Sequence, residues 1–218
     1  MQQIVLSRGK VFPLGVLASK LSRMNKPVDP RLDATRNHSL EAALLLLQDR
    51  GVLAVTHAAI SAKTGISRST LYRHWPKLGD LRNAAFARAA KAEVDERPID
   101  GPLKTDLKWI IGHLMKVLND TAWGKVAPQI IGMAATEDQT RDLMSAWIDD
   151  RSTDVAAVFE AARHRGELRA DAPFEQLIEM AIAIPYFRKL VAGRVLDPDW
   201  LESHVDLICS LATKKPSP

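Results

Sequence analysis

The chain has 218 residues, of which 46% are hydrophobic, so it is long enough to bury a core, and disorder throughout is excluded. Its one cysteine, Cys209, excludes an internal disulfide, and its six histidines lack metal-ligand spacing, so no metal or other cofactor is expected. Its hydrophobic runs are far shorter than the ~20 apolar residues of a membrane span. We therefore expect a soluble, cytoplasmic protein without a membrane partner.

Basic residues gather in the N-terminal part of the chain. The net charge is +4, yet residues 1–77 hold 12 of the 30 lysines and arginines and only 4 of the 26 acidic residues. The remainder of the chain is net acidic. By itself, this distribution fits two interpretations equally: a polyanionic partner at this end, or a basic segment that only aids solubility.

Residues 1–30 form the first predicted part of the chain. Residues 3–26 contain no acidic residue and mix apolar with basic side chains. Lys10 interrupts the apolar stretch, so the segment matches a secretory signal poorly. We expect a flexible basic extension, either a disordered arm or an upstream extension of a gene whose functional start is Met24.

Three helices are predicted in the next part of the chain. Apolar residues at three- and four-residue spacing predict a helix over 34–50, which Gly51 ends. Two short helices are predicted over 57–63 and 68–74, each after a threonine or serine that can cap it, with a turn at Gly65 between them.

Helices are also predicted throughout the rest of the chain. A Pro-Ile-Asp-Gly-Pro run at 98–102 resembles a boundary, and no strand-like alternation or internal repeat occurs. The predicted fold is therefore all-α, with a three-helix domain over 31–80 and a helical regulatory and dimerisation domain over 81–218. The later helices are predicted over 80–96, 103–120, 124–135, 138–165, 173–193 and 198–213.

The two short helices form a unit that is too small to hold a core of its own and well shaped to enter a groove of DNA, as in a helix-turn-helix. Ile60, Leu71 and Trp75 can pack inward. The second helix then exposes side chains that donate hydrogen bonds or stack, and it carries no carboxylate. These exposed side chains are Arg68, Ser69, Thr70, Tyr72, Arg73 and His74.

The segment from Gly65 to Trp75 has the sequence Gly-Ile-Ser-Arg-Ser-Thr-Leu-Tyr-Arg-His-Trp. It resembles the hallmark of the tetracycline-repressor-like (TetR) family of bacterial regulators, in which glycine is followed by Ser-x-x-Thr-Leu-Tyr-x-His and an aromatic residue. The preceding Leu40-Glu41-Ala42-Ala43-Leu44 also resembles the family. Altogether, residues 36–81 carry the similarity, a span appropriate to a small DNA-binding domain.

The resemblance implies a role for each side chain. Thr56 and Tyr72 would contact phosphates, and His74 would help to fix the DNA backbone. Arg68, Ser69, Thr70 and Arg73 would lie nearest the bases, although the two arginines alone could also be a solvated face. The DNA-binding residues expected are Arg36, Thr56, Ser67, Arg68, Ser69, Thr70, Tyr72, Arg73, His74 and Lys77.

The chain departs from the family pattern after the second short helix. Lysine followed by glutamate is common in the family where Leu78 and Gly79 stand. We expect Lys77 to take the place of the missing phosphate-binding lysine. A glycine inside a helix costs ~1 kcal/mol relative to alanine, so Gly79 is expected to weaken the helix that follows.

The later helices resemble the family's regulatory domain more weakly, notably at residues 165–171. The resemblance implies that helices 173–193 and 198–213 pair with those of a second subunit in a four-helix bundle. Packing inside one chain is the alternative for each residue of this seam. The candidates for the seam are Leu177, Met180, Ile184, Phe187, Leu201, Val205 and Ile208.

A ligand cavity is expected inside the same domain. Its candidate residues are mainly aromatic side chains and methionines, which suit a hydrophobic or aromatic compound. Most such residues at helical spacing are core packing, so we expect two or three of them to line a pocket. The candidates are Trp109, His113, Met115, Trp123, Met133, Trp147 and Phe159.

The expected function is that of a homodimeric transcriptional regulator that binds a palindromic DNA operator, as a repressor released by a small-molecule effector. The alternative is a constitutive dimeric DNA-binding protein or an activator without an effector. An enzyme is not expected, because the sequence has no glycine-rich phosphate loop, zinc-ligand spacing or Gly-x-Ser-x-Gly elbow, and no catalytic partner for Cys209 can be named.

Overall fold

The computed structural model describes residues 5–6, 10–11, 30–90 and 99–213. The chain divides into two units, residues 1–38 and residues 39–218, which we describe separately. Most of the extension predicted over 1–30 lies outside the described residues. Within it, β1 (Val5–Leu6) and β2 (Lys10–Val11) pair antiparallel, although the sequence predicted no strand.

The first helix, α2 (Pro30–Arg50), starts four residues before its predicted start and ends where predicted. It begins in the first unit and continues into the second. Within the second unit its side chains at Leu40, Ala43 and Leu47 are buried. A short 3-10 turn, η1 (Val52–Ala54), follows after Gly51.

The two predicted short helices are α3 (His57–Thr64) and α4 (Arg68–His74), and the prediction of their caps is confirmed. The Thr56 hydroxyl accepts a hydrogen bond from the Ala59 backbone N–H at 3.1 Å. Gly65 takes the left-handed conformation at φ 74°, which a glycine adopts without strain. These local contacts hold the turn between the helices.

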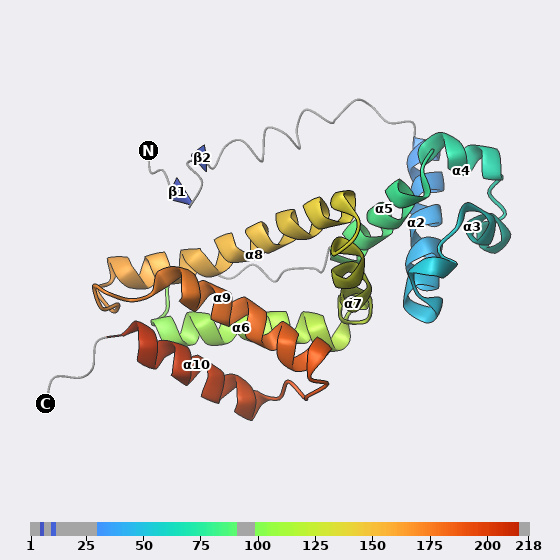
Figure 1. Cartoon of the computed structure of the whole chain (residues 1–218). Helices are drawn as coiled ribbons and strands as arrows, with labels where there is room; N and C mark the ends of the chain where they lie inside the picture. Colours follow the sequence, from blue (N-terminus) through green and yellow to red (C-terminus); the bar gives the residue numbers. More distant parts are fainter. Residues whose placement is uncertain (1–4, 7–9, 12–29, 91–98, 214–218) are drawn as a thin grey trace, which may run out of the picture. The chain divides into compact units, whose positions relative to one another are not determined.

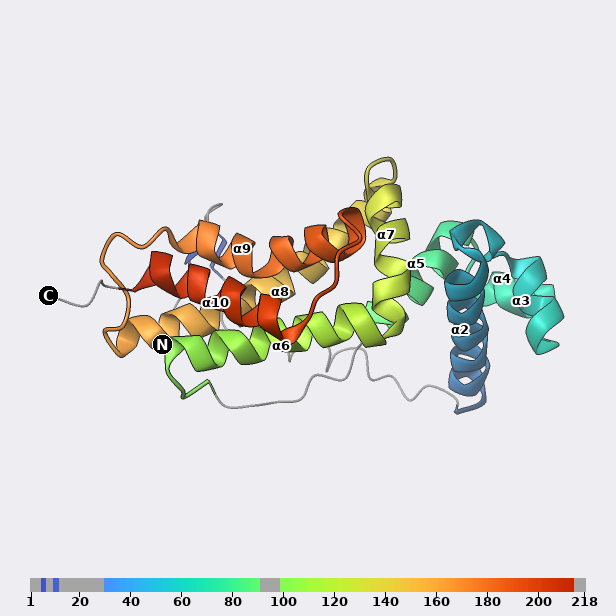
Figure 2. The same ribbon diagram turned by 90° about the horizontal axis from the view of Figure 1, so that it is seen from below.

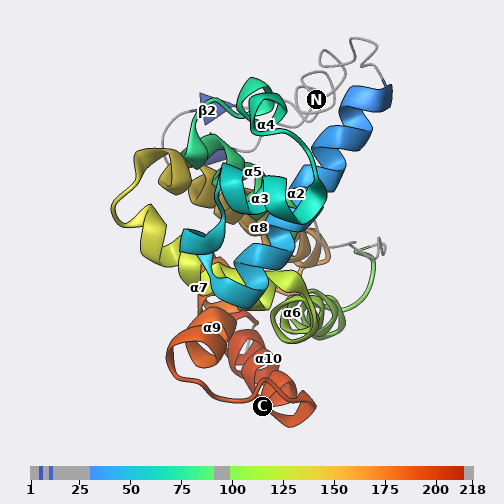
Figure 3. The ribbon, with the colours of Figure 1, turned by 90° about the vertical axis from the view of Figure 1, so that its right-hand side faces the viewer.

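The next helix, α5 (Leu78–Ala90), follows α4, and Figure 3 shows α3 nearer the viewer than α8 within the second unit. Its predicted C-terminal part, 91–96, lies outside the described residues. Gly79 lies in the first turn, where backbone N–H groups have no partner within the helix. The helix buries Leu81, Ala85 and Phe86 and contacts α7 and α8.

Four of the five later helices lie within two residues of their predicted bounds, and the fifth, predicted over 173–193, ends as an α-helix at Tyr186. Figures 1 and 2 show α6, α8, α9 and α10 side by side, with α7 crossing near one end. Their stripes of apolar residues meet in one core. The helices are α6 (Leu103–Asp120), α7 (Ala122–Ala134), α8 (Asp138–His164), α9 (Phe174–Tyr186) and α10 (Pro198–Ala212).

The end of α9 departs from regular α-helix. Pro185 lies inside the helix and cannot donate a backbone hydrogen bond. The chain continues as the π-helical segment η2 (Phe187–Val191), and the Ala192 N–H bonds to the Phe187 carbonyl at 2.8 Å. The sequence predicted one helix over 173–193. Among the described helices, none is long and apolar enough to cross a membrane.

Candidate DNA interface and regulatory cavity

The exposed face of α4 carries most of the predicted DNA-binding side chains. Arg68, Ser69, Tyr72 and Arg73 are exposed, and Thr70 is half-buried. Between Asp49 and Asp80 the sequence has basic residues but no acidic one. This short helix therefore presents hydrogen-bond donors in a positively charged setting, as contact with phosphates and base edges requires.

Of the remaining predicted DNA-binding residues, Ser67, His74 and Lys77 lie on or beside α4 in the sequence. Ser67 caps α4 through a bond from the Thr70 N–H to its hydroxyl, so part of its role is structural. His74 is half-buried, and Lys77 is exposed just before α5. Arg36 is exposed on the part of α2 that belongs to the first unit.

A histidine that the sequence analysis missed supports Tyr72. The ring of His57 stacks on the ring of Tyr72, with centroids 4.2 Å apart. His57 is buried, and its Nε2 donates a hydrogen bond to the Trp75 carbonyl at 2.8 Å. Tyr72 is 51% exposed. The stacking thus holds the phenol at the surface, and the place of His57 directly after the cap was its only signal in the sequence.

The turn between α2 and α3 is bound by a residue far away in the sequence. The side-chain amide of Gln129, on α7, accepts from the Val52 N–H at 2.6 Å and donates to the Leu47 carbonyl at 3.3 Å. Gly51 lies between these partners at φ 80°. The later helices therefore contact the backbone of the segment that leads into α3.

Two further hydrogen bonds join α5 to the start of α8. The Gln139 amide donates to the Asp80 carboxylate at 2.9 Å, and the Thr140 hydroxyl donates to the Asn83 side-chain oxygen at 3.1 Å. Thr140 is fully buried. Displacement of α7 or α8 would therefore disturb hydrogen bonds to the segments just before α3 and just after α4.

Two adjoining hollows lie among α5, α6, α7, α8 and α9. The larger, about 350 Å³, lies between α5, α7 and α8, and the smaller, about 50 Å³, between α6, α8 and α9. They share the wall residues Ala90, Trp147 and Arg151. Their lining is mostly apolar. We treat them as one cavity, of a size at the lower end of the range of ligand pockets.

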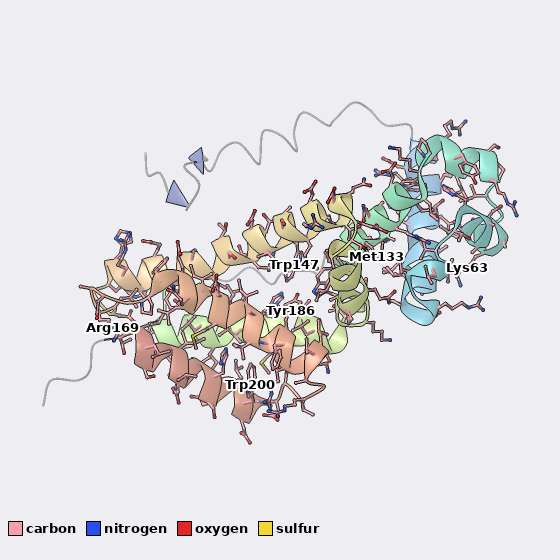
Figure 4. All side chains as sticks on the ribbon, in the orientation of Figure 1. Lys63, Met133, Trp147, Arg169, Tyr186 and Trp200 are labelled. Carbon is pink, nitrogen blue, oxygen red and sulfur yellow. The ribbon has the colours of Figure 1, made fainter. Side chains whose placement is uncertain are left out.

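Three of the seven predicted ligand residues line this cavity: His113, Trp123 and Trp147. The other four do not line either hollow. Met115 and Phe159 are buried in the core. Trp109 and Met133 are half-buried; Trp109 stacks on His113, and Met133, labelled in Figure 4, packs against the core from α7.

Three aromatic residues form a cluster at the cavity. Trp123 stacks on Trp147 with centroids 5.0 Å apart, and Trp147 meets Tyr186 edge-on at 5.4 Å. Trp123 Nε1 donates to the Tyr186 hydroxyl, and burial raises the pKa of Tyr186 well above its ordinary value. Figure 4 labels Trp147 on α8 and Tyr186 at the end of α9. The sequence analysis missed Tyr186.

The charged groups of the cavity come mainly from α8. Arg151 Nη2 lies 3.3 Å from the Asp154 carboxylate, and both residues line the cavity wall. Burial raises the pKa of Asp154, against the opposing effect of Arg151. Trp147, Arg151 and Asp154 follow at four- and three-residue spacing, which places them on one face of the helix. This spacing was visible in the sequence, yet the two charged residues were not predicted.

The predicted dimer seam needs correction. Leu177, Val205 and Ile208 are fully buried within the chain and Leu201 is 8% exposed, so these four have almost no surface for a second subunit. Met180 is half-buried. Ile184 and Phe187 are 39% and 57% exposed. Only these last two keep substantial apolar surface.

Comparison with known families gives two matches along the chain. Residues 40–85 match the family described as bacterial regulatory proteins of the tetR family. Residues 97–208, about half of the chain, match the tetracyclin repressor-like C-terminal domain. The two matches cover the helix-turn-helix and the helices around the cavity.

Curated relatives include an uncharacterised HTH-type transcriptional regulator of Mycobacterium tuberculosis, 25% identical over 183 residues, covering 84% of this chain and 90% of the relative. YdeS of Bacillus subtilis, also an HTH-type regulator, is 23% identical over 179 residues, with 81% and 88% covered. Both alignments extend across most of both proteins.

Solved structures share the fold. A TetR transcriptional regulator from Agrobacterium tumefaciens superposes with a TM-score of 0.69 at 21% identity, covering 86% of this chain and 96% of the other. A transcriptional regulator from Saccharomonospora viridis, in complex with choline, has a TM-score of 0.65 at 19% identity, with 84% and 100% covered.

Proposed function

Because this chain belongs to the TetR family of bacterial transcriptional regulators, which are DNA-binding proteins and not enzymes, we propose that it is a homodimeric repressor that a small molecule releases from a palindromic operator. The observation that carries this proposal is the exposed face of α4, where Arg68, Ser69 and Arg73 stand together without a carboxylate. A helix of this kind fits the major groove.

Within this proposal the side chains divide into two groups. Arg68, Ser69, Thr70 and Arg73 contact base edges and determine which sequence is bound. The others, Arg36, Thr56, Ser67, Tyr72, His74 and Lys77, contact phosphates or position the helix. Two copies of α4 in a dimer would address half-sites ~34 Å apart, one turn of DNA. The operator would lie on bacterial DNA, so the protein would act in the cytoplasm.

The dimer would bury the exposed apolar side chains of α9 and η2. Ile184 and Phe187 are the predicted seam residues that remain accessible, and Val191 is 73% exposed in the same segment. Burial of apolar surface is the main favourable term in association. The proposed seam is accordingly narrower than the sequence predicted.

The cavity supports the ligand part of the proposal. It is lined largely by apolar and aromatic side chains, and its walls include α7, whose Gln129 bonds to the backbone before α3. The structurally similar regulator in complex with choline indicates that this fold can hold a small molecule. A ligand that prefers the DNA-incompetent state by ~2.7 kcal/mol would weaken operator binding about a hundredfold.

The experiment that tests the proposal is selection of bound sequences from a random duplex pool by the purified chain, at an ionic strength near ~0.15 M. We expect an enriched palindrome. The double variant R68A/R73A should lose the enrichment while its helical circular dichroism stays unchanged, because both side chains are exposed. Lys116→Ala, which removes an exposed positive charge from α6, is the matched control and should enrich the same palindrome.

Failure of a folded, dimeric protein to enrich any sequence would refute specific DNA recognition. Once an operator is known, a reporter gene placed behind it gives the sign of regulation. Repression by the chain supports the proposal, and activation contradicts the repressor role. Binding that no compound weakens would instead support a constitutive DNA-binding protein.

A further inference from the structure

Arg151 is the one cationic side chain on the wall of both hollows among the described residues, and its bonding is incomplete. Its Nη2 contacts Asp154 at 3.3 Å, whereas its Nε is buried and has no acceptor within hydrogen-bond distance among the described residues. A guanidinium carries five N–H donors and stays protonated. Since buried polar groups in proteins nearly always have partners, the partial bonding of Arg151 needs an explanation.

The position of Arg151 supplies one. Its side chain is 31% exposed, on α8 where the two hollows meet, one turn from Trp147. The larger hollow is otherwise walled by apolar groups such as Phe86 and Met144 and by the exposed Asp150. A molecule in this space would rest against the aromatic cluster and lie close to the guanidinium. It could accept hydrogen bonds from donors that Asp154 leaves unused.

The charges around the cavity favour an anion over a cation. The guanidinium of Arg151 is positively charged, and a cation in either hollow would be repelled by it in a site of low polarity. The Asp154 side chain is 49% exposed, so solvent screens its negative charge, and this carboxylate is already paired with Arg151. Asp150 is exposed and its charge is screened by solvent.

We propose that the cavity binds a flat, apolar organic acid, whose ring packs against Trp147 and whose carboxylate is held by Arg151. This inference rests on the proposed function, since it names the ligand class of the same cavity. A planar guanidinium matches a carboxylate with two parallel hydrogen bonds, which a lysine in the same place cannot offer. Arg151 is thus the residue that determines specificity for the acid.

The test is calorimetric binding of three probes that share one skeleton: cinnamate, cinnamamide and cinnamylamine. They place an anion, a neutral acceptor and a cation at the same position. We expect the purified chain to bind cinnamate at least about tenfold more tightly than cinnamamide, as charge-assisted hydrogen bonds predict, and cinnamylamine most weakly. Tightest binding of the amine, equal binding of acid and amide, or no binding of any of the three overturns the proposal.

Two variants locate the effect. Arg151→Gln should reduce the acid-to-amide preference to about one while the amide binds as before, and Arg151→Lys should retain only part of the preference. Asp154→Asn is the matched control: it removes the neighbouring charge and should keep or increase the preference for acid. Persistence of the preference in Arg151→Gln would contradict the assignment. If that variant does not fold by circular dichroism, the lysine variant decides.

These measurements need no DNA, so they can refute the proposed ligand class without refuting the proposed repressor function. An enriched operator without preference for the acid would refute only the ligand class. Preference for the acid without any enriched operator would refute only the repressor. When both are found, cinnamate should weaken operator binding by the wild-type chain more than by Arg151→Gln.

Discussion

The α3–α4 pair and the cavity are built in opposite ways. The pair is held by contacts between near neighbours, such as the bond from the Ala59 N–H to Thr56, and it exposes its functional side chains. The cavity is assembled from five helices, and its two tryptophans, from α7 and α8, stack on one another in its wall. Substitutions of exposed side chains on α4 should therefore change DNA binding without changing stability, whereas substitutions around the cavity should change ligand binding and stability together.

The largest contrast is expected between two glycines. A Cβ on Gly124, in the first turn of α7, would stand 2.0 Å from the Leu118 carbonyl oxygen. We expect Gly124→Ala to lower the free energy of unfolding by about 3 kcal/mol, because the α6–α7 corner must open. Gly65→Ala meets no atom within 4 Å and only imposes φ 74° on an alanine, which costs ~1–2 kcal/mol.

Urea unfolding measures both effects. Gly132→Ala is the control within α7, since nothing lies near its added methyl group, and it should stabilise the protein by up to ~1 kcal/mol. If Gly124→Ala lowers the free energy of unfolding no more than Gly65→Ala does, then the α6–α7 corner is not tightly packed and the expected contrast is wrong.

A second contrast lies within α4. Arg68→Ala should cost ~1–3 kcal/mol of operator binding and relax the preference at one base position. Tyr72→Phe should cost ~1 kcal/mol equally on every sequence, because it removes the proposed phosphate contact and keeps the ring on His57. Fluorescence anisotropy with the operator and with base-substituted operators measures both, and equal losses on all duplexes from both variants would contradict these roles.

A smaller effect is expected where the two regions meet. Gln129→Ala removes the bonds to the Val52 N–H and the Leu47 carbonyl, and should lower the free energy of unfolding by ~1–2 kcal/mol. Gln139→Ala is the control, because its bond to Asp80 is exposed and should contribute little. Chemical denaturation tests the pair, and equal effects of the two variants would show that Gln129 has no special role.

The smallest effect concerns acid stability. Lys104 and Lys108 bind Glu202 across α6 and α10 and lower the pKa of this carboxyl to about 2. A lowered pKa in the folded state means that the stabilisation is present above the ordinary pKa of 4.5 and is lost as the pH falls toward 2. Glu202→Gln should therefore flatten the fall in melting temperature over this range, slightly, because all three groups are exposed. An unchanged pH profile would contradict the shift.

Features that depend on contacts between neighbours in the chain could be predicted from the sequence, whereas features that depend on distant contacts could not. The caps at Thr56 and Ser67 and the bounds of α6 were predicted correctly, since they depend on neighbours in the chain. Tyr186 was missed because its contact with Trp147 depends on how α8 and α9 pack. Arg151 was missed although it follows Trp147 by one helical turn, because spacing alone does not show that a hollow lies beside this face of α8.

The dimer seam shows a further limit. The apolar spacing of Leu177, Val205 and Ile208 predicts a buried stripe, and these residues are buried, but inside their own chain. Apolar spacing along a helix indicates that one face is buried, but it does not indicate whether the same chain or a second subunit buries it. A residue available to a second subunit must stay exposed in the folded single chain, as Phe187 does.

The bonds of Gln129 also bear on how such proteins can be recombined. Both of its partners are main-chain atoms, the Val52 N–H and the Leu47 carbonyl, which nearly every amino acid supplies at those positions. A helix-turn-helix of different sequence could therefore be grafted onto these rear helices without loss of this connection. The side-chain pairs at Asp80 and Asn83 would have to be carried over with the graft. The helices that would recognise an operator and those that would bind an effector could then be exchanged separately between such proteins.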